Sequence, residues 1–369
     1  MRQFYLIVIF ILNFWSLTAQ KGLTGHPNWI IKSCYNQGII LIHRSSIADL
    51  VKGYPAIYEL NFIKPTLGNK LWQTENNLPE VGITTQLIDF KNPAHLGYGL
   101  IAAPFIEIPL NQKIKPSRIY MRICWGLSYI TKPFNVHTNQ NNIAIGSALN
   151  QYVQFRWFWK FKLNKNLIFE PGFTFSHTSN ARAQVPNLGL NIATLHTAIS
   201  FRLPSNKTIP QVIKQDSATK VKSKNEIVTF ASIGFNQREV NLKKQMCYMW
   251  AIYYQRNVRN THKFGLGLNF FHDQNYLIDY ENTGLDPSKT IDKNRMSLNF
   301  VYSYNIGRIS IPTEVGYYFL AKANADGNIV SRISVNYYAK NGLFIHAGLR
   351  THFAIAYNFE YGLGYRFYL

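Results

Sequence analysis

The chain closes on the sequence YGLGYRFYL, residues 361–369, in which an apolar or aromatic side chain stands at every second position. Successive side chains of a β-strand point to opposite faces, so this alternation predicts a strand with one continuous apolar face. The same period of two recurs in other segments of about ten residues, such as 264–270 and 296–305. No long stretch has the apolar periodicity of a helix. The sequence therefore predicts an all-β protein.

The composition indicates that this β-protein meets lipid. Aromatic residues make up 15% of the chain, with 23 Tyr and 25 Phe, and charged residues also make up only 15%. A soluble domain usually has nearer a quarter of its residues charged, whereas membrane barrels carry girdles of aromatic side chains. The ending on an aromatic strand also resembles the C-terminal signal of bacterial outer-membrane proteins, whose last strand closes the barrel. We expect a transmembrane antiparallel β-barrel.

The pattern predicts about sixteen strands, eight between residues 33 and 203 and eight between 227 and 369. The polar, basic stretch 204–226 separates the two sets and is predicted to be a linker or a long loop. Short turns (LNKN, RNTHK, GR and AKNG) fall after even-numbered strands, as expected for periplasmic turns. Two layouts fit: one sixteen-stranded barrel, which we favour, or two eight-stranded units, since eight strands already close a filled barrel. The second half would then be a degenerate repeat.

Further features indicate where the chain resides and what it can bind. Residues 1–19 have a basic start, an apolar run too short to span a bilayer and a final Ala, which predicts a cleaved signal peptide. The formal net charge of +21 fits a surface beside phosphorylated lipid, and no nucleic-acid module is present. Cys34, Cys124 and Cys247 form neither a disulfide framework nor a zinc pattern. We expect no cofactor and no metal, and the oligomeric state stays open.

The segment FEPGFTFSHTSNARAQVPNLGLN, residues 169–191, carries the clearest sign of chemistry. It resembles the active-site strand pair of the PagL-type lipid A deacylases. That family's signature is His-x-Ser-Asn, then a Pro-Asn pair, then an acidic residue fourteen positions after the His. The resemblance covers about forty residues, within a region 20–203 that matches the family's barrel more loosely. The matching residues are His177, Ser179, Asn180, Pro186 and Asn187, and Asn191 stands where the family has Glu.

The resemblance implies an outer-membrane esterase that removes an acyl chain from lipid A, the lipid part of lipopolysaccharide, without a cofactor. A serine hydroxyl is a weak nucleophile until a base takes its proton. His177 and Ser179 are two residues apart on one strand, so their side chains are neighbours and His177 can act as that base. Asn191 can orient the imidazole through its amide oxygen, as Asn does in papain-like enzymes. Asn180 and Asn187 are expected to form the oxyanion hole, and Arg182 to contact a lipid phosphate or glucosamine.

Strand parity supports this site independently of the resemblance. Residues 167, 169, 171, 173 and 175 are apolar and share one face, which must be the lipid face of a barrel strand. His177 and Ser179 continue that face, and the alternation of the next strand places Asn191 there as well. Glu170 and His196 have the opposite parity and are predicted to point into the lumen.

Other interpretations stay open at this point. The barrel could be a passive pore or a structural protein, with a site that has decayed because Asn replaces the acid. A charge-dense lumen would favour the pore, but the predicted lumen faces are mainly Gly, Ser, Asn and Thr. An acyltransferase or a phospholipase acting on the same leaflet is a weaker alternative. A faint repeat of the motif at 343–367 contains His352 and Glu360, which could form a second site. The alternation of that strand, however, predicts that His352 points into the lumen.

Overall fold

The computed structural model of the protein describes residues 29–111, 117–203, 224–278, 284, 293–321, 326–353 and 355–369. The predicted signal peptide, residues 1–19, and residues 204–223 of the predicted linker lie outside these ranges. Over the described residues the chain forms sixteen strands, and short helical segments lie between some of them. None of its described helices is long and apolar enough to cross a membrane.

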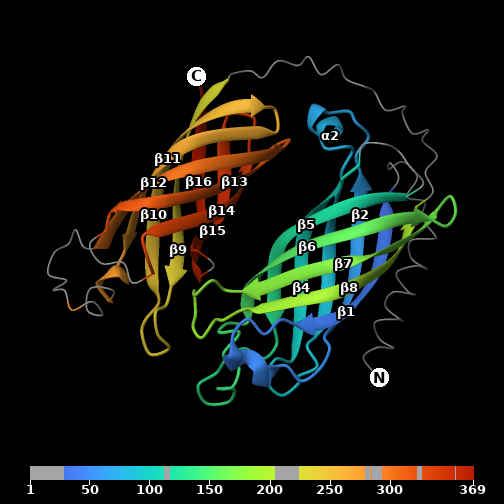
Figure 1. The fold of residues 1–369 in the computed structure, drawn as a ribbon, viewed down its shortest axis with the longest axis horizontal. Coiled ribbons are helices and arrows are strands. Elements are labelled where there is room, and N and C mark those ends of the chain that lie inside the picture. The colour runs from blue at the N-terminus through green and yellow to red at the C-terminus, as the bar shows by residue number, and fades with distance from the viewer. Residues whose placement is uncertain are drawn as a thin grey trace.

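The sixteen strands form two separate closed barrels of eight antiparallel strands each (Figure 1). The first barrel closes because its last strand pairs with its first, with Ile31 opposite Phe201. Its strands are β1 (Ile30–Ile40), β2 (Ala56–Pro65), β3 (Glu80–Asp89), β4 (Tyr98–Pro109), β5 (Ser117–Ile130), β6 (Leu149–Lys162), β7 (Leu167–Ser179) and β8 (Leu190–Arg202).

The second barrel is built in the same way and closes where Gly362 lies opposite Ser232. Its strands are β9 (Asn225–Asn236), β10 (Gln245–Arg259), β11 (His262–Asp273), β12 (Asn294–Ile306), β13 (Ile309–Leu320), β14 (Ile329–Tyr338), β15 (Leu343–His352) and β16 (Ile355–Tyr368).

The predicted strand number and the short turns after β6, β12 and β14 are confirmed, at residues 163–166, 307–308 and 339–342. Our preference for one sixteen-stranded barrel was wrong. Each strand has two edges, and β8 uses its edges for β7 and β1, so none is left to pair with β9. Alternation along a strand reveals its two faces but not its partner, which is why the sequence left both layouts open.

The outer wall of both barrels is apolar. Leu195 is 74% exposed, Phe173 44%, Phe300 54% and Leu363 68%. A soluble protein rarely exposes a continuous apolar surface of this extent, whereas a barrel in a bilayer needs one to face the hydrocarbon. The three cysteines are free and buried within this architecture.

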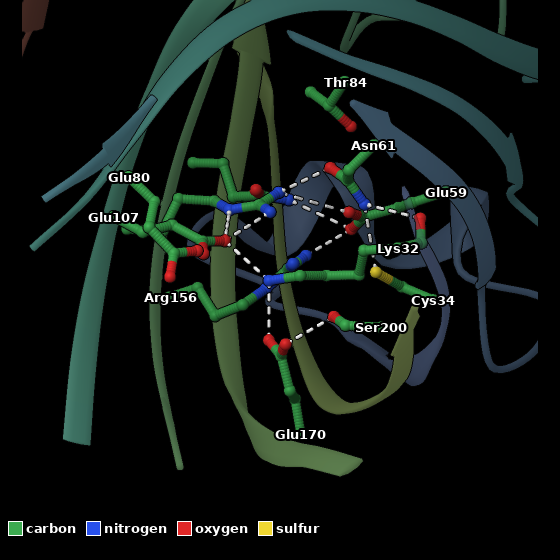
Figure 2. A network of polar contacts seen from close by, with 12 residues as sticks. Lys32, Cys34, Glu59, Asn61, Glu80, Thr84, Glu107, Arg156, Glu170 and Ser200 are labelled. Carbon is green, nitrogen blue, oxygen red and sulfur yellow. Dashed lines mark hydrogen bonds and ion pairs between the residues drawn. The ribbon is translucent and has the colours of Figure 1, made fainter. Parts of the chain in front are cut away.

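The lumen of the first barrel holds a dense network of buried ion pairs (Figure 2). Lys32 Nζ lies 2.8 Å from Glu107 and 2.6 Å from Glu170. Arg122 Nη2 lies 2.6 Å from the same Glu107 carboxylate. Two further pairs join Lys160 to Glu80 and Arg156 to Glu59. The prediction of a lumen poor in charge was therefore wrong, because each strand contributes only one or two inward charges and only closure gathers them.

These charges fill the lumen and do not line an open channel at their level. Lys32, Arg122, Glu107 and Glu170 side chains have no solvent exposure. The second barrel repeats the arrangement, with Glu360 forming ion pairs with Arg332 at 3.3 Å and with Arg350 at 3.3 Å. Eight-stranded barrels have an interior just wide enough for side chains, in line with this packing.

The lumen positions predicted from parity are confirmed in both barrels. Glu170 forms an ion pair with Lys32, and His196 Nδ1 lies 2.5 Å from Asn36 Oδ1. His352 points inward to Tyr318, with 3.1 Å between Nε2 and the hydroxyl. Glu360 and His352 thus belong to interior packing of the second barrel.

The two barrels contact each other at both ends and along the wall. At one end, the short helix α2 (Leu71–Glu75) lies beside the second barrel, where Asn260 Nδ2 donates to Glu75 Oε1 at 2.6 Å. On the wall, Gln151 Nε2 donates to the Tyr361 hydroxyl at 2.6 Å. At the opposite end, the loop after β7 meets the loop after β9, where the Gln237 N–H donates to the Arg182 carbonyl at 2.8 Å. The chain therefore holds two barrels side by side.

Removing Glu107 tests the role of the lumen network. Glu107→Gln leaves buried cations with too little negative charge, so we expect it to lower the free energy of unfolding by about 3–5 kcal/mol. Heat-dependent gel mobility of the protein in detergent micelles measures the loss. Asp89→Asn is the control, because its pair with Lys91 is partly exposed and should contribute at most about 1 kcal/mol. Equal stability of Glu107→Gln and the wild type would contradict this role.

Candidate active site

β7 and β8 bring the predicted catalytic residues together at one end of the first barrel. His177 lies directly opposite Asn191 in the antiparallel ladder. His177 Nε2 is 2.9 Å from Ser179 Oγ, and His177 Nδ1 is 2.6 Å from Asn191 Oδ1. The three side chains therefore form a continuous Ser–His–Asn chain of hydrogen bonds, as expected for a nucleophile, a base and an orienting group.

This hydrogen-bond chain fixes the protonation pattern of the imidazole. An amide oxygen only accepts, so Asn191 Oδ1 requires a proton on His177 Nδ1. The neutral ring then has its lone pair on Nε2, which accepts the hydroxyl proton of Ser179. A histidine in this tautomer can remove that proton as a general base.

The outward parity predicted for these residues is confirmed. Their neighbours Ser176, Thr178 and Ile192 are at most 2% exposed and face the lumen, while Phe173 and Leu195 on the other face are exposed. His177 and Asn191 share this outer face and are half-buried. Ser179 is only 5% exposed, because the loop between β7 and β8 packs beside it.

Gly189 in that loop packs closely against His177 and Ser179. A Cβ added to Gly189 would lie 2.7 Å from His177 Cε1 and 3.3 Å from Ser179 Cβ. Its φ of +76° also lies in the region that favours glycine. The sequence shows this glycine in the motif, but only the fold shows that its missing side chain makes room for the imidazole.

Asn180 and Asn187 hold the shape of the loop. Asn180 Nδ2 donates to Ser147 Oγ at 2.7 Å and to the Gln184 carbonyl at 2.9 Å, so both of its amide hydrogens are engaged. The Asn180 backbone N–H donates to Asn187 Oδ1 at 3.0 Å, so this bond engages the oxygen of the Asn187 amide and not its nitrogen. The oxyanion-hole role of the two residues stays a prediction.

Arg182 reaches the second barrel. Its guanidinium pairs with Asp326 at 3.7 Å, and Arg238 pairs with the same carboxylate at 2.8 Å. Burial raises the pKa of Asp326, but the positive charge of Arg238 and its cationic neighbours lowers it below the ordinary value. Asp326 therefore stays anionic and pairs with Arg182. The contact of Arg182 with a lipid phosphate or glucosamine stays a prediction.

Gln237, just after β9, clamps the same loop. Besides the bond from its backbone N–H to Arg182, its side-chain oxygen accepts from the Val185 N–H at 2.9 Å. Lys244 adds a 3.2 Å bond to Gln184 Oε1. The second barrel therefore supports the loop that covers Ser179.

His43 is a residue of the site that the sequence reasoning missed. It follows β1, and its Nδ1 lies 3.2 Å from Asn191 Nδ2. The signal that could have found it is the closure of the barrel, because β1 pairs with β8 up to Ile40 opposite Ile192. Within the described residues no group of His, Cys, Asp and Glu is arranged to hold a metal ion.

Comparison with known proteins gives a family match for each barrel. The model of the lipid A 3-O-deacylase (PagL) matches residues 56–200, and the model of the acyloxyacyl hydrolase C-terminal domain matches residues 225–369. His177, Ser179 and Asn191 all lie in the first match. The two matches together span more than half of the chain and correspond to the two barrels.

Solved structures are less similar. A crystal structure of the outer membrane enzyme PagL is 17% identical, covers 45% of this chain and 97% of its own, and has a TM-score of 0.31. A triple mutant of the Rhodopseudomonas blastica porin is 8% identical, covers 92% of this chain and 99% of its own, and has a TM-score of 0.17. A search of curated proteins gives no match.

The hydrogen-bonded Ser–His–Asn site and the family models that match both barrels lead to one assignment. This chain belongs to the PagL-type lipid A 3-O-deacylase and acyloxyacyl hydrolase family.

Proposed function

We propose that the protein is an outer-membrane lipid A deacylase that hydrolyses an ester-linked acyl chain of lipopolysaccharide with Ser179 as nucleophile. The observation that carries this proposal is the 2.9 Å contact between His177 Nε2 and Ser179 Oγ on the outer wall of the barrel. A pore has no need of a base and a hydroxyl on its lipid face. An enzyme whose substrate is a membrane lipid needs them there.

The direction of the strands supports a site in the outer leaflet. Each barrel has an even number of strands, so its first strand begins and its last strand ends on the same side. The short turns also lie on that side. Short turns are periplasmic in bacterial outer-membrane barrels. Ser179 ends β7 at the opposite, extracellular side, level with the leaflet that contains lipid A. The protein would thus reside in the bacterial outer membrane with its site open to that lipid.

In the first half of the reaction, Ser179 Oγ attacks the ester carbonyl carbon while His177 Nε2 takes its proton. The imidazolium is held by its Nδ1–H bond to Asn191 Oδ1. The amide of Asn187 supplies a hydrogen bond to the developing oxyanion. The intermediate then breaks the bond to the sugar oxygen, and His177 returns the proton to that leaving oxygen.

In the second half, water releases the acyl chain from Ser179. His177 takes a proton from the water, which attacks the acyl-enzyme carbonyl, and then protonates Ser179 Oγ as the carboxylic acid leaves. Asn191 orients the ring in both halves but, unlike a carboxylate, adds no negative charge to stabilise the imidazolium. No cofactor enters any step.

The lumen gives no support to the alternative of a passive pore. Its charges are abundant, which by itself would favour conduction, but Glu107 and its cationic partners are buried and paired with one another. Water-filled channels belong to barrels with more strands.

Ser179→Ala tests the proposed nucleophile. We expect the rate of lipid A deacylation to fall roughly 10³-fold or more, because removal of the nucleophile abolishes the covalent route. Purified protein is incubated with lipopolysaccharide, and mass spectrometry follows the loss of one hydroxyacyl chain. Ser176→Ala is the control, since this serine lies on the same strand but faces the lumen. Undiminished deacylation by Ser179→Ala would refute the mechanism.

Gly189→Ala tests the packing around the base. The new methyl group would displace the His177 ring, and a misplacement of about 1 Å can lower the rate about 10²-fold. Gly284→Ala is the control, because Gly284 has a similar positive φ of +71° but nothing within 4 Å. Both variants should fold, and only Gly189→Ala should lose lipid A deacylation. A fully active Gly189→Ala protein would show that Gly189 does not confine the imidazole.

A further inference from the structure

We infer that His43 is a positioning residue that holds the Asn191 amide in the one orientation that keeps His177 a base. This inference rests on the proposed function and concerns how the site works without the acid that its family has. His43 lies before residue 56, where the match to the deacylase model begins. That match therefore says nothing about it.

The segment around His43 is anchored on both sides. The Leu41 N–H donates to the Asn191 carbonyl at 2.8 Å, which continues the β1–β8 ladder beyond the end of β1. The short helix η1 (Ser45–Leu50) follows, and its Ile47 and Leu50 are buried in the apolar core of the first barrel. The backbone on either side thus fixes an exposed imidazole beside Asn191.

The contacts of His43 select one tautomer. Its Nε2 lies 3.1 Å from the carbonyl oxygen of Leu188, which can only accept, so Nε2 carries the proton. Nδ1 of the neutral ring is then an acceptor and receives the Asn191 Nδ2–H at 3.2 Å. The competing tautomer would give up the Leu188 bond for a longer, 3.4 Å contact from Nδ1 to the Leu41 carbonyl.

The orientation of the Asn191 amide decides whether His177 can act. With its nitrogen on His43, the amide points its oxygen at His177 Nδ1. A flipped amide would point its N–H₂ at His177 Nδ1, and that nitrogen would have to accept. The proton of His177 would then sit on Nε2, which could no longer take the Ser179 proton. His43 disfavours this flip because its Nδ1 lone pair would face the Asn191 oxygen.

A carboxylate would not need this help. Both oxygens of an acid at position 191 accept hydrogen bonds, so either rotation of the group keeps the proton on His177 Nδ1. An amide has one oxygen and one nitrogen and must be oriented from outside. The hydrogen bond between Asn191 and His43 therefore supplies the orientation that an acid at position 191 would not need.

A double-mutant cycle tests this inference on the full-length protein with lipopolysaccharide as substrate. His43→Ala should lower kcat about three- to tenfold, the effect of one lost hydrogen bond, with KM unchanged. In the Asn191→Asp background, His43→Ala should change kcat less than about twofold, because the acid needs no orientation. His43→Gln retains an acceptor and should fall between the wild type and His43→Ala.

Each other outcome contradicts the inference in its own way. Equal losses of kcat in both backgrounds would mean that His43 acts by supporting the fold. An increase in KM at constant kcat would mean that it contacts the lipid. If Ser179→Ala loses activity but the substitutions at His43 and Asn191 act independently of each other, only the assignment of His43 is overturned. Full activity of Ser179→Ala would overturn the proposed function and this inference together.

Discussion

The antiparallel pairing of β8 with β1 is the interaction on which the rest of the structure depends. It closes the first barrel after eight strands and so separates a packed lumen from an outer wall that faces hydrocarbon. It also carries the end of β1 to Asn191, so that Leu41 extends the ladder and His43 reaches the amide. Without that closure, the Ser–His–Asn chain would lie at an open sheet edge, which lipid does not tolerate.

The second barrel is separate from the first because of the same closure. Because both edges of β8 are already paired, β9 pairs with β16 and the second set of strands closes on itself. Its contacts with the first barrel are consequently made by loops and wall side chains. Gln237 and Asp326 hold the backbone and the guanidinium of the loop that covers Ser179. The second barrel thus acts on the site from outside, as a support for the loop.

Periodicity accounts for most of the features that the sequence predicted correctly. Alternation indicated sixteen strands, their turns and the outward parity of His177, Ser179 and Asn191, because a strand has a period of two wherever it lies. It could not indicate the features that depend on pairing between distant strands. Three features could be predicted only by someone who knew that β1 lies beside β8. They are the number of barrels, the charge-dense lumen around Glu107 and the position of His43. The ion pair of Arg182 with Asp326 was not predicted either, because nothing in the local sequence indicates it.

The most direct test of the central claim is covalent labelling with a lipid-like fluorophosphonate, which reacts with activated serines and reports the nucleophile itself. The folded protein in detergent micelles is labelled, digested and mapped by mass spectrometry, with His177→Ala as the matched unactivated protein. We predict that the phosphonyl group is found on Ser179 and that the label is lost in His177→Ala. A stoichiometric label on another residue, or an unlabelled Ser179 in protein that still deacylates lipopolysaccharide, would contradict the claim.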